Sequence, residues 1–130
     1  MFTPQSAFSG FSVNDLIKAQ DFYKNILGLS VKDIGMGLQI QLPGGGIVFV
    51  YEKKDHVPAS FTILNFEVAS IDESVDILMA KGVKFERYDG MPAPQDEKGI
   101  LRGLSANQGP DIAWFKDPAG NVLSVLQNDK

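Results

Sequence analysis

The chain contains one arrangement of residues twice, and this internal repeat limits its fold more than any other feature of the sequence. A Phe-x-Val triplet that begins at Phe11 recurs 55 residues later at Phe66. A glycine that follows the next segment recurs from Gly28 to Gly82, at a spacing of 54 residues. A repeat of this length indicates two copies of one supersecondary unit.

The first copy predicts a strand, a helix and three more strands. Residues 8–13 alternate in side-chain character, as strands do. Apolar side chains recur at helical spacing across residues 14–28, where Asn14 or Asp15 can cap the start and Gly28 supplies a left-handed stop. Three short runs of strand-forming residues follow, separated by turns that contain glycine, at 29–34, 37–42 and 47–52.

The second copy repeats this order. Residues 61–68 predict its first strand, and the sequence Ser-Ile-Asp-Glu from Ser70 predicts a capping box for a helix that stops at Gly82. The buried stripe of that helix is expected to hold Ile71, Val75, Leu78 and Met79. The three remaining strands are expected at residues 83–88, 111–116 and 121–127.

A connector at about residues 53–60 separates the copies. The length of 130 residues predicts a single domain, 1–130, with a first module at about 7–52 and a second at about 61–127. The element order predicts an α+β fold of two tandem βαβββ modules. Residues 89–110 are too long for a hairpin connection, so they form either a cover over a pocket or a mobile surface loop.

The composition argues against several classes of protein. Apolar residues make up 44% and charged residues 22%, as in soluble globular proteins. No apolar run is long enough to cross a membrane, and no secretory signal is recognisable. The lack of cysteine removes disulfides and thiolate ligands and is compatible with the cytoplasm, where we expect the protein. A net charge of −4 without a basic cluster argues against nucleic acid as a partner.

Two stretches of the sequence resemble a known family. The segment "FSVNDLIKAQDFYKNILGL" resembles the opening of a vicinal oxygen chelate module, and "WFKDPAGNVLSVLQ" resembles its closing strand pair. This superfamily includes glyoxalase I, bleomycin-resistance proteins, fosfomycin-resistance transferases and extradiol dioxygenases. The resemblance extends over about residues 7–127 and is closest to the bleomycin-resistance-like members.

The resemblance implies an architecture. Paired βαβββ modules form a mixed sheet that curls into an open cup, with the helices outside and a ligand pocket inside. The modules pair either within one chain or across a dimer, and small members are often homodimers. Because this fold carries many chemistries, the resemblance indicates the fold more specifically than the activity.

The resemblance also places the metal ligands of metal-using relatives onto this sequence. Histidine at the first strand of each module corresponds to Phe8 and Ile63, and glutamate in the last strand corresponds to Ser124. The matching position in the first module is Phe49. Phenylalanine and isoleucine have no donor atoms, and a neutral hydroxyl is a poor ligand for these ions. We therefore expect a metal-free cup with no cofactor and, on balance, no enzyme.

Alternation along the strands gives the residues that face the cup. The predicted face is mainly aromatic and aliphatic, and its few polar points are Ser12, Tyr51, Asn65, Glu67 and Ser124. Alternation on its own does not say whether Trp114 or Phe115 faces inward; we place Trp114 there. The alternative is a cup filled by its own large side chains. The predicted ligand-binding residues are Phe8, Phe49, Tyr51, Ile63, Asn65, Trp114 and Ser124.

Other candidate residues are assigned to the surface. His56, the single histidine, lies beside Asp55 in the connector and is expected to be solvated rather than catalytic. No serine has a recognisable histidine–acid pair. Arg87 and Arg102 are expected to be surface charges rather than anion clamps.

The leading hypothesis is metal-independent binding and sequestration of a small organic molecule, such as an antibiotic or a toxic metabolite. The aromatic face favours a hydrophobic or aromatic ligand, and the acidic balance favours a cationic one. The alternative is a metal-dependent lyase, isomerase or dioxygenase of the same superfamily that uses non-standard ligands. A third hypothesis is a structural or regulatory domain whose filled cup binds nothing.

Overall fold

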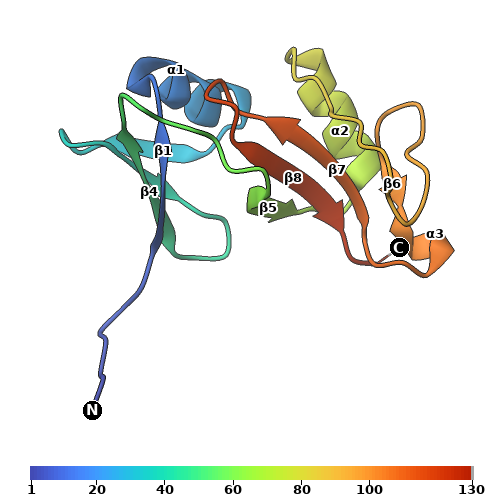
Figure 1. Ribbon diagram of the computed structural model, residues 1–130, viewed down its shortest axis with the longest axis horizontal. Coiled ribbons are helices and arrows are strands. Elements are labelled where there is room, and N and C mark those ends of the chain that lie inside the picture. Colours follow the sequence, from blue (N-terminus) through green and yellow to red (C-terminus); the bar gives the residue numbers. More distant parts are fainter. Residues whose placement is uncertain (130) are drawn as a thin grey trace. The chain divides into compact units, whose positions relative to one another are not determined.

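The computed structural model describes residues 1–129, and the chain divides into two compact units. The first unit is Met1–Pro58, and the second begins at Ala59. Each unit contains one four-stranded mixed sheet (Figure 1). The predicted α+β class and the two tandem βαβββ modules are therefore confirmed. No helix among residues 1–129 is long and apolar enough to span a membrane.

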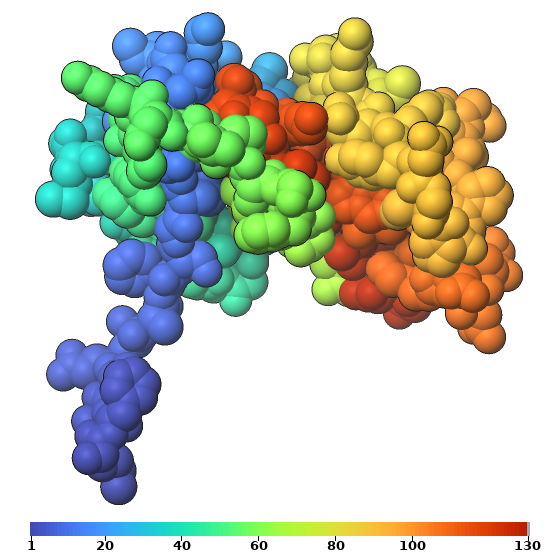
Figure 2. Space-filling view, in the orientation of Figure 1, coloured from blue at the N-terminus to red at the C-terminus, as the bar shows by residue number. Residues whose placement is uncertain are grey.

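The first unit has the strand order β1-β4-β3-β2, with β1 parallel to β4 and the other pairs antiparallel. The first seven residues are exposed and extend from β1 as a narrow arm (Figures 1 and 2). The elements of this unit are β1 (Ser9–Val13), α1 (Leu16–Asp21), the π-helix η1 (Phe22–Ile26), β2 (Ser30–Asp33), β3 (Leu38–Gln41) and β4 (Ile47–Glu52).

The helix α1 begins where its backbone amides find acceptors. The Asp15 carboxylate accepts the N–H groups of Ile17 and Lys18 at 3.0 and 3.1 Å, so Asp15 rather than Asn14 is the cap. The turn after η1 ends at Gly28, whose φ of 73° lies in the left-handed region, as predicted.

The core of the first unit lies between its sheet and α1–η1. Tyr23 is fully buried, and its ring packs edge-on against Phe22 at 5.2 Å and tilted against Phe11 at 5.8 Å. Phe11 thus marks the face of β1 that is turned toward the helix. The other buried residues on this side are Val13, Leu38, Ile40, Val48 and Val50.

The second unit has the strand order β5-β8-β7-β6, with β5 parallel to β8. The parallel pairing of the first and last strands of the unit therefore matches that of the first unit. The elements are β5 (Thr62–Glu67), α2 (Ile71–Ala80), β6 (Leu101–Arg102), α3 (Gly103–Ala106), β7 (Asp111–Lys116) and β8 (Val122–Gln127).

The helix α2 has the predicted start and stop, but its buried stripe is narrower. The Ser70 hydroxyl accepts the Glu73 N–H at 3.3 Å, and Gly82 follows the helix with a φ of 93°. Ile71, Val75 and Leu78 are buried, as predicted, whereas Met79 is 48% exposed. The inclusion of Met79 was wrong because one residue advances about 100° around a helix and leaves the stripe.

The fourth strand of the second sheet does not come from residues 83–88, and this prediction was wrong. Phe85 makes an isolated bridge to Phe115, and Glu86 N–H donates to the Trp114 carbonyl at 2.8 Å. The edge of β7 is completed by β6, which lies inside the segment expected to be a loop. Residues 85–86 and 101–102 both hydrogen-bond to the same edge of β7. Side-chain alternation cannot show which of these stretches forms the regular strand pairing.

Candidate functional site

The strand register of the second sheet fixes which side chains face α2. Arg102, Asp111 and Gln127 lie in one row across β6, β7 and β8. Arg102 donates to Asp72 of α2, and Gln127 accepts the N–H of Ile71 at 2.9 Å, so this row is turned toward the helix. Alternation along the strands therefore turns the side chains of the neighbouring rows away from α2.

The row that faces away from α2 joins Asn65, Ser124 and Trp114 as direct cross-strand neighbours. Ser124 has no exposed surface, and its hydroxyl donates to the Asn65 carboxamide oxygen at 2.5 Å. Asn65 is exposed and Trp114 is half-buried. The register thus settles the question of strand parity, because Trp114 and Ser124 share one face while Phe115 lies on the other.

Two residues that were not predicted hold the indole of Trp114. Its N–H donates to the Thr62 hydroxyl at 3.1 Å, and the Tyr88 ring packs edge-on against it at 5.5 Å. Burial raises the pKa of the Tyr88 phenol, and the Glu86 carboxylate adds to this rise. Tyr88 was expected within a strand, and nothing in the sequence indicated its contact with the Trp114 indole.

Ile63 lies at an irregularity of β5. The register shifts between Thr62 and Leu64, so Ile63 has no partner residue in β8. Ile63 is half-buried. At the other end of the strand, Glu67 is exposed and its carboxylate accepts from the Asn128 amide at 2.8 Å.

The residues at the positions of the implied metal ligands do not fit a divalent ion. Phe8, Phe49 and Ile63 offer only carbon atoms, and the Ser124 hydroxyl already donates to Asn65. Across residues 1–129, no group of three or more histidine, cysteine, aspartate or glutamate side chains could hold a metal ion. The donor set therefore disagrees with the one that metal-using relatives are expected to carry.

The first sheet presents an aromatic face on the side opposite α1. Gly10 pairs with Phe49 and Ser12 pairs with Tyr51, and none of these shares the face of Phe11. The rings of Phe49 and Tyr51 stack at 5.9 Å with an angle of 18° between their planes. Phe8 precedes β1 and is 64% exposed.

Gly37 makes room for the Phe49 ring. A Cβ atom at this position would lie 2.9 Å from two ring carbons of Phe49 and 2.5 Å from the Val50 carbonyl oxygen. Such approaches are closer than carbon atoms tolerate, so the ring keeps its place only because position 37 has no side chain.

His56 differs from its prediction as a solvated connector residue. It is half-buried, and its Nδ1 lies 2.6 Å from the hydroxyl oxygen of Ser12. The connector makes this contact by folding back: the Lys53 N–H donates to the Val13 carbonyl at 2.9 Å, and the His56 N–H donates to the Lys53 carbonyl at 3.1 Å. No sequence signal indicated a contact between residues 44 positions apart.

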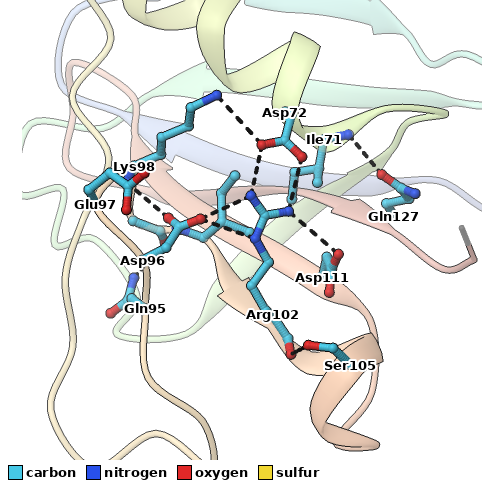
Figure 3. A network of polar contacts seen from close by, with 12 residues as sticks. Ile71, Asp72, Gln95, Asp96, Glu97, Lys98, Arg102, Ser105, Asp111 and Gln127 are labelled. Atoms are coloured by element: carbon cyan, nitrogen blue, oxygen red, sulfur yellow. Dashed lines mark hydrogen bonds and ion pairs between the residues drawn. The ribbon is translucent and has the colours of Figure 1, made fainter.

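Arg102 is also not a simple surface charge. Its guanidinium donates to both oxygens of Asp72 at 3.0 and 2.7 Å and to Asp96 at 3.1 Å (Figure 3). The bonds from Arg102 lower the pKa of the Asp72 carboxyl, and those to Asp72 raise the pKa of the guanidinium. The Asp111 carboxylate lies 3.7 Å from the same guanidinium.

This network anchors part of the long segment between α2 and β7. Asp96 accepts the N–H groups of Lys98 and Ile100, both at 2.9 Å, and Lys98 pairs with Asp76 of α2 at 2.9 Å. Arg87 donates to the backbone carbonyls of Asp96 and Glu97. The segment expected to be a cover or a mobile loop is therefore tied to α2 around residues 96–102.

The comparisons with known proteins identify a family. The model described as the Glyoxalase/Bleomycin resistance protein/Dioxygenase superfamily matches residues 8–125. No curated protein matches the chain.

Solved structures share the fold at low sequence identity. TnmS3, an antibiotic binding protein from Streptomyces sp. CB03234, is 22% identical, with a TM-score of 0.66 over 98% of this chain and 100% of that one. The genomically encoded fosfomycin resistance protein FosX from Listeria monocytogenes is 17% identical, with a TM-score of 0.67 over 99% and 96%. A glyoxalase/dioxygenase from Nostoc punctiforme is 14% identical, with a TM-score of 0.68 over 95% and 90%.

Proposed function

Because the chain belongs to the Glyoxalase/Bleomycin resistance protein/Dioxygenase superfamily, as its motifs predicted, we propose that it binds a small, planar organic molecule without a metal ion. The binding residues in this proposal are Trp114, Ser124, Asn65 and Ile63 of the second module. The aromatic face of the first module, with Phe8, Phe49 and Tyr51, is a further surface of the same chemical kind.

The observation that carries the proposal is the row of Asn65, Ser124 and Trp114. The Ser124 hydroxyl is buried and engaged at the position where a carboxylate ligand is implied by the family. Trp114 supplies a flat apolar surface whose polar edge is already satisfied by Thr62. A surface of this kind suits an aromatic ring system.

Asn65 gives the row one directional polar group. Its carboxamide oxygen accepts from Ser124, so the NH₂ group is the donor that it can offer to a ligand. A ligand with a carbonyl or phenolate oxygen beside its rings would use both the indole and this donor. The net charge of −4 favours a cationic ligand over an anionic one of the same shape.

The functions of two structural relatives agree with this proposal in kind. TnmS3 is an antibiotic binding protein, and FosX is a fosfomycin resistance protein. We propose that the ligand of this chain is likewise an antibiotic or a toxic metabolite, which the protein sequesters. We also propose that the protein is a cytoplasmic homodimer. Size-exclusion chromatography with light scattering would test the oligomeric state.

The experiment is a thermal-shift measurement in EDTA with three probes: 9-aminoacridine, anthraquinone-2-sulfonate and the non-planar amine amantadine. A compound that binds only the folded state at 100 times its Kd adds about 2.7 kcal/mol of stability. We expect the planar probes to raise Tm and amantadine to leave it unchanged.

The variant Trp114→Ala should lose the shift. Phe2→Ala, which removes an exposed ring from the N-terminal arm, is the matched control and should keep it. A shift that survives Trp114→Ala would refute the placement of the ligand. About one tightly held divalent ion per chain, in protein purified without chelator, would refute the metal-free proposal.

A further inference from the structure

Ser12 and His56 form a hydroxyl–imidazole pair on the face of β1 that is turned away from α1. The hydroxyl oxygen and Nδ1 are 2.6 Å apart. A nucleophile and a base within hydrogen-bond reach are the geometric signature of an activated hydroxyl. An imidazole that accepts at Nδ1 is neutral and carries its proton on Nε2. In that state His56 can take the proton of Ser12.

The backbone of the connector positions the base. The two hydrogen bonds that fold residues 53–56 back toward Val13 are 2.9 and 3.1 Å long. The ion pair between Lys53 and Asp55, at 2.8 Å, closes the same turn. His56 is therefore held over Ser12 by the turn, in the role that a carboxylate plays in a three-residue triad.

Two features of β1 reduce the number of side chains around Ser12. β1 is an edge strand of its sheet, and Gly10, two residues earlier on the same face, has no side chain. Tyr51 is the direct cross-strand neighbour of Ser12 and is 37% exposed. The phenol of this cross-strand neighbour is a hydrogen-bond donor of the kind that can stabilise developing negative charge on an acyl oxygen.

We propose that Ser12 is the nucleophile of an acyl-transfer site that acts on small carboxylic esters, with His56 as its general base. The Ser12 oxygen forms a bond to the acyl carbon while His56 Nδ1 takes the hydroxyl proton. The tetrahedral adduct places its oxyanion by the Tyr51 phenol. It collapses by breaking the bond to the leaving alcohol, which receives the proton from His56.

Water completes the cycle. His56 takes a proton from a water molecule, whose oxygen adds to the acyl carbon of the Ser12 ester. Collapse breaks the bond to Ser12, and the proton on His56 returns to the serine oxygen. The products are one carboxylic acid and one alcohol per ester and water consumed, so the reaction needs no redox partner and no metal. This proposal uses residues of the first module, and the binding proposed at Trp114 uses residues of the second, so each can be tested independently of the other.

The test uses p-nitrophenyl acetate with the full chain in EDTA. We expect a burst of p-nitrophenolate that approaches one equivalent per chain, and peptide mass spectrometry should find the acetyl group on Ser12. His56→Gln should slow acetylation of Ser12 about 100-fold, the scale of general base catalysis. Ser105→Ala removes an exposed hydroxyl that donates to a backbone carbonyl, and it should leave the burst unchanged.

Two results would overturn the proposal. One is a burst that persists in Ser12→Ala, because the imidazole itself would then be the acceptor of the acetyl group. The other is acetylation of Ser12 no faster than that of Ser105 in the wild-type protein. Circular dichroism checks that each variant is folded. If Ser12→Ala does not fold, Ser12→Thr keeps a hydroxyl at the site, and its acetylation at position 12 decides the question in the same way.

Discussion

The two modules use the same parallel pairing of their first and last strands but place different side chains on it. In the first module, Gly10 of β1 pairs with Phe49 of β4; in the second, Asn65 of β5 pairs with Ser124 of β8. In the first pair Gly10 has no side chain to contact Phe49, and in the second pair the two side chains form a hydrogen bond. The difference shows that a few face positions set the chemistry while the backbone ladder stays the same.

The modules also differ at the far edge of their sheets. The first ends in β2 and β3, a regular hairpin of four-residue strands. The second ends in the two residues of β6, which Arg102 ties to α2 through Asp72. A strand this short gains little from its own ladder, so the ion-pair network takes the place of a longer strand in fixing that edge.

The largest change in stability is expected from Ser124→Glu in the second module. It gives the second module the carboxylate implied by the family, but in a fully buried position with no matching donors at Phe8, Phe49 or Ile63. We expect a loss of at least about 3 kcal/mol of unfolding free energy, because a buried charge without a partner is costly.

Urea unfolding with and without Zn²⁺ or Mn²⁺ measures this effect. Ser105→Glu, at an exposed position of α3, is the control and should cost little. If either ion restores the stability of Ser124→Glu, a hidden donor set exists and the account of the second module is wrong.

A smaller effect is expected from Gly37→Ala in the first module. The new methyl group must displace the Phe49 ring or the Val50 carbonyl. Overpacking of this kind costs about 2 kcal/mol. Gly10→Ala adds a methyl group at a tight contact of 3.3 Å from the Phe49 carbonyl, which is less severe than the approaches at Gly37, so it should cost less. Equal unfolding free energies for the two variants would show that Phe49 is not held over Gly37.

Arg102→Met tests the edge of the second module. Removing the guanidinium leaves Asp72, Asp96 and buried Asp111 without their shared partner. Because Arg102 is about one-third exposed, we expect a loss of only about 1–2 kcal/mol. Lys53→Met, which breaks an exposed pair in the first module, should cause no resolvable change.

The pH dependence of the Arg102→Met effect has a definite sign. Arg102 lowers the pKa of Asp72 in the folded state, so the stabilisation is complete above the unfolded pKa of about 3.9. It is lost as the pH falls through the lower folded value. The difference in unfolding free energy between wild type and variant should therefore shrink below about pH 4. A difference that grows on acidification contradicts this assignment.

The smallest change is expected from Thr62→Val. It removes the acceptor of the Trp114 indole N–H with little change in volume, at a cost of about 1 kcal/mol. Since Trp114 is the single tryptophan, its fluorescence reports directly on this bond. Thr3→Val in the N-terminal arm is the control. An emission spectrum unaltered by Thr62→Val would mean that the indole is not held by Thr62.

Local features were predictable from the sequence because their causes are local. The cap at Ser70 and the left-handed stops at Gly28 and Gly82 depend on side chains within a few residues of each helix end. The repeat gave the element order of both modules. The strand pairing then places Asn65 beside Ser124, a contact that the alternation did not specify.

The features that were missed depend on contacts between distant residues. The pairing of β6 with β7, the contact of His56 with Ser12 and the bond of Trp114 to Thr62 each join residues that the sequence separates. Which face Trp114 occupies could be read only from the register of β7 with β8. The register shift near Ile63 in β5 was likewise not predictable. Side-chain periodicity carries no information on such contacts.

The central claim, metal-independent binding at Trp114, is tested most directly by titrating the fluorescence of that residue with 9-aminoacridine. Metal-independent binding predicts saturable quenching at one equivalent per chain, with the same Kd in EDTA and in added Mn²⁺ or Zn²⁺. Quenching that does not saturate, or that appears only after a divalent ion is added, would contradict it.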